Sequence, residues 1–86
     1  MPWHIYIVRC SDTTLYTGIS NDVRRRVKTH NRKKGALYTK FRAPVRLVYT
    51  EAVLTRSAAL IREREIKKLT RKQKLKLVRM KTKERH

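Results

Sequence analysis

The sequence is poor in cysteine, glycine, proline and acidic residues. Its 86 residues include one cysteine, Cys10, with two glycines and two prolines. A single cysteine excludes a disulfide framework and a metal site built from several thiolates, and it favours a reducing, cytoplasmic setting. So little glycine and proline argues against long disordered linkers. No window approaches the roughly 18 apolar residues of a membrane span, and residues 1–20 do not resemble a signal peptide, so no membrane partner is expected.

The shortage of acidic residues leaves a large positive charge. There are 24 Lys and Arg against 6 Asp and Glu, a formal net charge of +18, and 11 of the basic residues precede position 56. Because such a field attracts polyanions and releases counterions from them, it predicts binding to DNA, or to RNA. The alternatives are a solvated basic face and a ribosome-associated RNA-binding protein without catalytic activity. Association with a nucleoid is consistent with the charge.

The chain length allows one small domain, expected over residues 1–82, with a frayed end at 83–86. Alternation and turn residues predict an α+β fold, a small three-stranded antiparallel sheet flanked by helices in the order β-β-α-β-α-α. Segment 36–43 is ambiguous. The third strand should place Val45, Leu47 and Tyr49 on one face, and Thr70 and Gln73 have capping-box spacing. The expected strands are 3–9, 15–20 and 45–53. The first helix is expected to follow one of three candidate N-caps at 20–22 and to end near 31, and the other helices are expected over 57–69 and 70–81.

Two tyrosines occupy the first two predicted strands. If these strands pair across a three-residue loop, Tyr6 falls opposite Gly18 and Tyr16 falls opposite Val8, so that both phenols point to one face. Gly18 would then leave space beside Tyr6 for a substrate backbone. The alternative is ordinary strand packing with a hydroxyl at the rim.

The first predicted helix brings an arginine and a histidine toward the sheet. Val23 and Val27 define its inward stripe, and Arg26 and His30 lie beside that stripe as neighbours four residues apart. Arginine suits a phosphate, and histidine can carry a proton near neutral pH. The alternative is a partly buried histidine beside one more surface cation.

The second long helix carries Glu63 and Glu65 at opposite edges of its apolar stripe, so periodicity does not choose between them. The basic field would keep either carboxylate ionised and able to hold a divalent cation. The alternative is an intrahelical ion pair between Glu63 and Lys67.

The segments His4-Ile5-Tyr6 and Tyr16-Thr17-Gly18 together resemble the paired signature of the GIY-YIG nuclease superfamily. Residues 22–30 are similar to its first helix, and residues 62–67 are similar to the segment that carries its metal-binding glutamate. The E-x-x-I-K spacing in that segment selects Glu63. The pattern covers nearly the whole chain and is most similar to the small stand-alone bacterial members. Many members carry a later asparagine. Residues 64–86 contain none, and Gln73 is a candidate for its role.

The resemblance implies a metal-dependent endonuclease that hydrolyses DNA phosphodiester bonds, with branched, nicked or damaged DNA as candidate substrates. A tyrosine acts as general base, Arg26 stabilises charge on the phosphate, and Glu63 holds one Mg²⁺ or Mn²⁺ ion. Tyr6 and Tyr16 both remain candidates for the base. Space beside Gly18 favours Tyr6, and nearby cations are expected to lower its pKa. The expected catalytic residues are Tyr6, Tyr16, Arg26, His30 and Glu63. The expected nucleic-acid contacts are Arg24, Lys33, Lys34, Lys40, Arg42, Lys72 and Lys74.

Two other functions fit the same sequence. One is a DNA-binding or structured-RNA-binding protein that keeps the nuclease fold without turnover. The other is a module that docks to a larger repair or recombination complex through its basic last helix. The sequence leaves the oligomeric state open.

Overall fold

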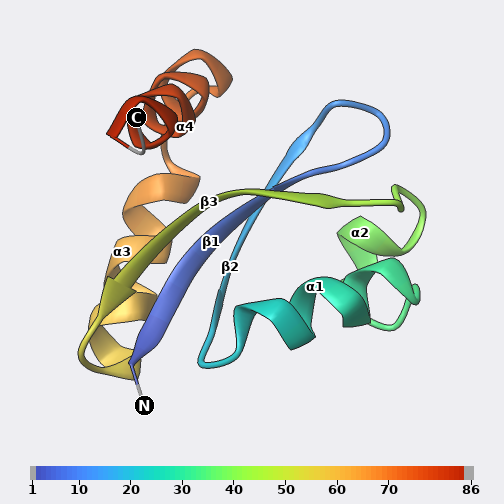
Figure 1. Ribbon diagram of the computed structural model, residues 1–86, viewed down its shortest axis with the longest axis horizontal. Coiled ribbons are helices and arrows are strands. Elements are labelled where there is room, and N and C mark those ends of the chain that lie inside the picture. Colours follow the sequence, from blue (N-terminus) through green and yellow to red (C-terminus); the bar gives the residue numbers. More distant parts are fainter. Residues whose placement is uncertain (1, 85–86) are drawn as a thin grey trace.

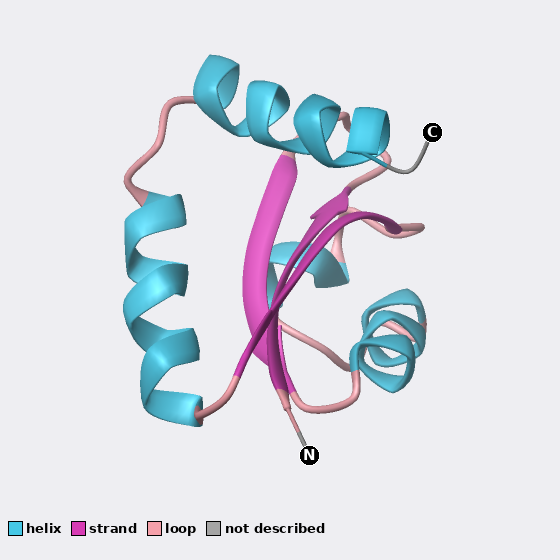
Figure 2. Cartoon of the chain, turned by 60° about the vertical axis from the view of Figure 1, so that its left-hand side comes forward, coloured by secondary structure: helices cyan, strands magenta, loops and turns pink. Residues whose placement is uncertain are grey.

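In the computed structural model, which describes residues 2–84, a three-stranded sheet lies between two sets of helices (Figures 1 and 2). The strands are β1 (Trp3–Arg9), β2 (Leu15–Ser20) and β3 (Arg46–Val53), all antiparallel, in the order β2-β1-β3. The helices are α1 (Val23–Asn31), α2 (Leu37–Lys40), α3 (Arg56–Lys67) and α4 (Arg71–Glu84). The predicted fold class is confirmed, and the short α2 lies in the segment that the sequence left ambiguous. Within residues 2–84 no helix is long and apolar enough to span a membrane.

The β1–β2 hairpin has the predicted register. Tyr6 lies opposite Gly18 and Val8 lies opposite Tyr16. The Cys10 N–H donates to the Thr14 carbonyl at 2.8 Å, which closes the three-residue loop. This register places both phenols on the same side of the sheet.

The predicted common face of Val45, Leu47 and Tyr49 is wrong. Ile7 of β1 pairs with Tyr49 and the next residue, Val8, pairs with Leu47, so β3 carries an extra residue at this point. A β-bulge of this kind reverses the alternation of side chains along the strand. Val45 therefore packs with Tyr6, whereas Tyr49 packs on the opposite face of the sheet.

The sheet has a core on each face. On one face, Ile5 and Ile7 pack against α3 and α4, and on the other, Tyr6 and Val8 pack against α1. Side chains of β1 alternate between these faces, and as the central strand β1 is buried on both sides. The tyrosine pair thus occupies the face that α1 covers.

Side-chain caps fix the starts of α1, α3 and α4. The Asp22 carboxylate accepts the Arg25 N–H at 3.2 Å at the start of α1. The predicted capping box forms at α4, where Thr70 N–H donates to Gln73 Oε1 and Gln73 N–H donates to the Thr70 hydroxyl. Of the segment 83–86 that was expected to fray, residues 85–86 lie outside the described residues.

Candidate active site

Tyr6 and His30 form a buried hydrogen-bonded pair. The Tyr6 hydroxyl oxygen lies 2.8 Å from His30 Nε2, with Tyr6 supplied by β1 and His30 by the last turn of α1. His30 is fully buried, and 1% of Tyr6 is exposed. The inward stripe of α1 therefore carries His30 directly onto the phenol, as the helical spacing predicted.

A threonine fixes which ring nitrogen of His30 holds the proton. The Thr39 hydroxyl donates to the Ala36 carbonyl at 3.0 Å, so its oxygen accepts a hydrogen bond from His30 Nδ1–H at 2.7 Å. Nε2 of the neutral ring then carries a lone pair and accepts the Tyr6 O–H. Tyr6 therefore donates to His30, His30 donates to Thr39, and Thr39 donates to the Ala36 carbonyl.

The environment holds both members of the pair neutral. Burial and the nearby Arg26 guanidinium lower the pKa of His30 below its usual 6.5. Burial raises the pKa of Tyr6 above 10, helped by Tyr16 and Glu63, while Arg26 lowers it. The expectation that neighbouring cations bring the Tyr6 pKa down is wrong for the protein alone, because the cost of desolvating a phenolate exceeds the effect of Arg26.

Tyr16 lies at the other side of the histidine. Its ring meets the His30 ring edge-on, with 5.4 Å between centroids, and stacks on Tyr38 of α2 at 5.7 Å. The Arg42 guanidinium carbon lies over the Tyr38 ring, 4.0 Å from its centroid. A continuous stack therefore leads from the buried histidine to the surface.

Glu63 of α3 is near enough to Tyr6 for its carboxylate charge to contribute to the raised pKa of the phenol. The Glu63 side chain is 18% exposed, against 61% for Glu65, which forms an ion pair with Arg62 at 3.8 Å. Lys67 Nζ lies 3.4 Å from Glu63, so the intrahelical pair also forms. The structure distinguishes two carboxylates that the helical wheel could not.

Glu63 matches one mode of cation binding. Among residues 2–84, no group of three or more His, Cys, Asp or Glu side chains could hold a metal ion. Mg²⁺ commonly keeps several waters and is held by one or two carboxylates together with substrate phosphates, so a single carboxylate fits it. Mn²⁺ shares this preference for carboxylate and water ligands, whereas Zn²⁺ or Cu²⁺, which favour imidazole or thiolate ligands, do not fit this site.

The two glycines of the chain each lie against one member of the pair. A Cβ atom at Gly18 would lie 2.6 Å from the Tyr6 hydroxyl oxygen, and one at Gly35 would collide with His30 Nδ1. The space expected beside Gly18 is thus filled by Tyr6 itself, and the prediction that a substrate backbone approaches there is wrong. Neither glycine has a positive φ, so their role is to permit close approach.

We expect Gly18→Ala to destabilise the fold by about 1–3 kcal/mol, because the added methyl group overlaps a phenol that its bond to His30 holds in place. Urea denaturation would measure the change. As a control, Ala52→Gly removes a methyl group at an exposed position of β3. This change should lower stability only through the difference in strand propensity, which is under about 1 kcal/mol. Wild-type stability of Gly18→Ala would contradict this packing.

Stability should fall as the pH drops below about 6.5. A histidine with a lowered pKa in the folded state binds its proton more readily when unfolded, so stability is complete above the unfolded pKa and decreases toward the folded one. The slope due to His30 is at most about 1.4 kcal/mol per pH unit. Urea denaturation between about pH 7 and 5 would show it, and His30→Gln should remove that component. An unchanged slope in His30→Gln would contradict the assignment.

The sequence model of the GIY-YIG catalytic domain matches residues 2–76, which contain this whole cluster. The chain belongs to the GIY-YIG family. This GIY-YIG domain is 58% identical over 74 residues to the UPF0213 protein SERP0126 of Staphylococcus epidermidis, covering 86% of this chain and 90% of the relative. UPF0213 proteins of Staphylococcus aureus match at the same identity. These relatives are small bacterial proteins that consist almost entirely of this domain.

Two solution structures share the fold of this GIY-YIG domain. The UPF0213 protein BH0048 of Bacillus halodurans is 44% identical, with a TM-score of 0.61 over 94% of this chain and 86% of that one. The protein EF2693 of E. faecalis is 36% identical, with a TM-score of 0.65 over 100% and 92%. The arrangement of sheet and helices therefore recurs in its bacterial relatives.

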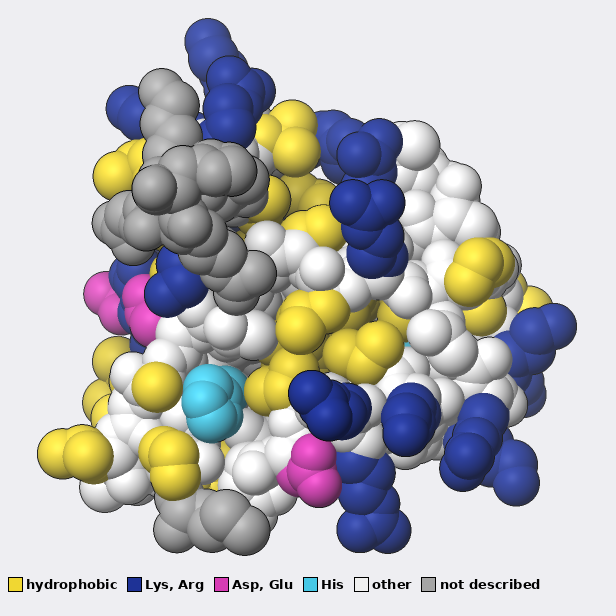
Figure 3. Space-filling model, viewed as in Figure 1, with side chains coloured by type: hydrophobic (Ala, Val, Ile, Leu, Met, Phe, Trp, Pro, Cys, Tyr) yellow, Lys and Arg dark blue, Asp and Glu magenta, His cyan; other side chains and the backbone are white. Residues whose placement is uncertain are grey.

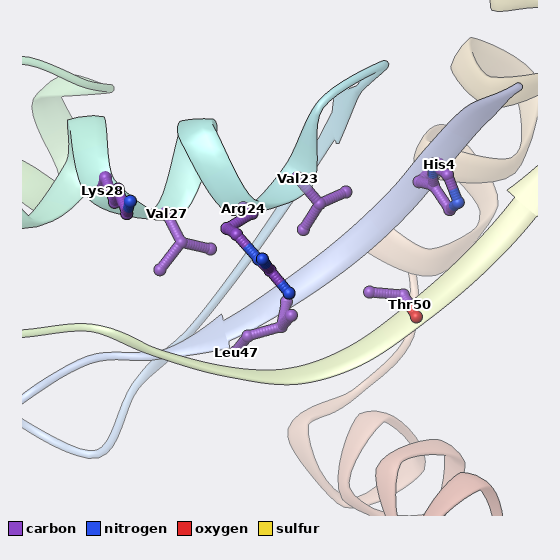
Figure 4. A pocket seen from close by; sticks show the side chains of 7 residues that line it. All are labelled: His4, Val23, Arg24, Val27, Lys28, Leu47 and Thr50. Atoms are coloured by element: carbon purple, nitrogen blue, oxygen red, sulfur yellow. The ribbon is translucent and has the colours of Figure 1, made fainter. Parts of the chain in front are cut away.

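The sequence-predicted basic residues of this GIY-YIG domain fall into separate regions. Arg24 lines a cavity of about 410 Å³ between α1 and β3 (Figure 4). Arg26 lies two residues later, about 200° around the helix from Arg24. Figure 3 shows hydrophobic side chains in this hollow with Lys and Arg below them. Lys72 and Lys74 belong to α4, which packs on the other face of the sheet. Arg42 lies on Tyr38 of the tyrosine stack, Lys33 and Lys40 line a hollow beside Phe41, and Lys34 lies in the loop between α1 and α2.

The sequence did not predict the roles of Tyr38 and Thr39 in this site. They lie in the ambiguous segment, and nothing in their spacing indicates that one stacks on Tyr16 and the other bonds to His30. The suggested role of Gln73 is not supported, because its side-chain oxygen accepts the Thr70 N–H and caps α4.

Proposed function

We propose that this chain is a metal-dependent endonuclease that hydrolyses DNA phosphodiester bonds, with branched, nicked or damaged DNA as candidate substrates. The observation that carries the proposal is the buried hydrogen bond from the Tyr6 hydroxyl to neutral His30, with Arg26 and Glu63 within electrostatic range. Burial of a phenol and an imidazole as a directed pair matches proton transfer better than simple DNA binding, for which surface cations suffice.

The directed pair answers an objection to a tyrosine base. A phenol with a raised pKa is almost never a phenolate at neutral pH, so Tyr6 does not act by prior ionisation. Instead, the neutral phenol accepts a proton from water while passing its own proton to His30 Nε2. The water oxygen bonds to phosphorus, the bond to the leaving oxygen breaks, and solvent protonates that oxygen.

Arg26 and Thr39 assist this transfer in different ways. Arg26 is close enough to Tyr6 to lower the pKa of its phenol in the free protein, and it would turn to a bound phosphate, where charge develops during attack. Thr39 holds His30 Nδ1–H, so that Nε2 stays available as the acceptor. Tyr16 packs edge-on against the imidazole and limits its rotation. Glu63 would hold Mg²⁺ or Mn²⁺, which when bound stabilises negative charge on the phosphate and leaving oxygen.

The test is a cleavage panel of linear, nicked, flap, Y-shaped and four-way DNA, each with Mg²⁺, Mn²⁺ or EDTA. We expect cleavage with a divalent ion and none with EDTA. Purified protein that binds these DNAs with unchanged affinity in EDTA and cuts none of them under either ion would refute the proposal and indicate a non-catalytic binding protein.

A further inference from the structure

Leu37 and Phe41 form an exposed apolar pair beside the candidate active site. They are 75% and 78% exposed, at the start and just after the end of α2. Single exposed apolar side chains are common on protein surfaces, whereas large neighbouring ones make a candidate contact surface. Figure 3 shows hydrophobic side chains on the outer surface over α2, next to Lys and Arg.

The outward direction of this pair follows from the bond that fixes α2. Thr39 points inward, because its hydroxyl accepts His30 Nδ1–H and is fully buried. Leu37 and Phe41 lie two residues to either side, about 200° around the helix from Thr39 and about 40° from each other. The same contact that orients the histidine thus holds both apolar side chains toward solvent.

The pair is continuous with the aromatic stack of the site. Tyr38, between Leu37 and Thr39, stacks on Tyr16, which meets the His30 ring. A group that rests on Leu37 and Phe41 therefore lies next to the end of the stack that begins at the buried histidine.

The surroundings of the pair are cationic. Lys40 Nζ lies 5.5 Å from the Phe41 ring centroid, and Lys33, Lys40 and Phe41 line a hollow of about 230 Å³. That hollow is smaller than a typical drug-sized site and presents two ammonium groups, which suits a phosphate. A second copy of this chain, also carrying +18, would be repelled. Charge complementarity favours a polyanion with flat apolar groups.

We propose that Leu37 and Phe41 form a wedge that stacks against unpaired bases of a DNA strand, while Lys33 and Lys40 hold the adjacent phosphate. Aromatic side chains stack on bases of any sequence, and apolar wedges enter disrupted base steps. Bases in an intact duplex are already stacked on each other, so they offer the wedge little free surface for stacking. The proposal rests on the proposed nuclease function and narrows its substrate to DNA with unpaired nucleotides near the cut.

The experiment measures binding without cleavage. Fluorescence anisotropy in EDTA would compare a labelled single strand, a flap duplex and a blunt duplex on the wild-type chain, Phe41→Ala and Leu37→Ala. We expect Phe41→Ala to weaken binding of the single strand and the flap by about tenfold, and of the blunt duplex by less than about twofold. Phe41→Tyr should keep the wild-type preference, because its ring can still stack.

Leu54→Ala is the matched control, since Leu54 is 92% exposed in the turn between β3 and α3, and its loss should change nothing. The wedge would be overturned if Phe41→Ala lost affinity equally for all three DNAs or lost none. It would also be overturned if Leu54→Ala lost as much affinity as Phe41→Ala. So would a wild-type dimer that Phe41→Ala dissolves in sedimentation, which would assign the patch to a second copy. A chain that cuts no DNA yet shows the Phe41-dependent preference would refute the nuclease proposal and support the wedge.

Discussion

Replacing Glu63 by glutamine should abolish DNA cleavage while leaving DNA binding and folding intact. Glutamine keeps the size of the side chain but removes the negative charge that would hold a divalent ion, so we expect the cleavage rate to fall at least about 100-fold. Loss of the partly exposed pair with Lys67 should cost only a few tenths of a kcal/mol. Plasmid and flap cleavage in Mg²⁺ would measure the rate, and electron paramagnetic resonance of Mn²⁺ would measure ion binding.

Glu65→Gln is the matched control for this prediction. Glu65 lies two residues along the same helix, in the same basic surroundings, with its side chain largely in solvent. We expect its cleavage rate and its Mn²⁺ binding to stay within about twofold of wild type, because exposed ion pairs contribute little. If both variants lost activity equally, the net charge of α3, rather than a specific carboxylate, would be responsible.

Replacing Tyr6 by phenylalanine should reduce cleavage by about 100- to 10,000-fold, because it removes the group that exchanges a proton with both water and His30. The variant also leaves His30 Nε2 without its partner in a buried site, which should cost about 1–3 kcal/mol of unfolding free energy. Single-turnover cleavage and urea denaturation would separate the chemical effect from the structural one. DNA affinity in EDTA should be unchanged.

Tyr49→Phe tests whether lost stability alone lowers activity. Tyr49 is also buried, and its hydroxyl donates to Glu51 on the other face of the sheet, where burial raises its pKa to about 12. We expect a loss of about 1 kcal/mol in stability with cleavage near the wild-type rate. Comparable losses of activity in both variants would argue that Tyr6 acts through the fold.

The local parts of this architecture could be predicted from the sequence. The hairpin register follows from the short loop between the strands, which fixes Tyr6 opposite Gly18. The Thr70 capping box is likewise contained in four consecutive residues. The inward positions of Arg26 and His30 follow from helical periodicity, since their neighbours Val23 and Val27 must pack on the sheet.

The parts that failed depend on contacts between distant residues. The bulge in β3 is set by pairing with β1, about 40 residues earlier, and no local signal in β3 marks it. Helix α2 is only four residues long and includes a β-branched threonine, so its intrinsic propensity is weak, and the Thr39–His30 bond ties it to α1. Helical periodicity could not choose between Glu63 and Glu65, because their exposures depend on how α3 packs, and at the level of the sequence only the resemblance selected Glu63.

The close fit of Gly35 against His30 offers a genetic tool. An alanine there would displace the imidazole from Tyr6 and Thr39 without adding or removing a charge, and without altering the basic surface that a polyanion meets. A cell carrying that allele would contain a protein with the positive surface charge of the natural protein, but with His30 displaced from Tyr6. Such a separation-of-function allele would show which phenotypes depend on cutting a nucleic acid and which depend only on occupying it.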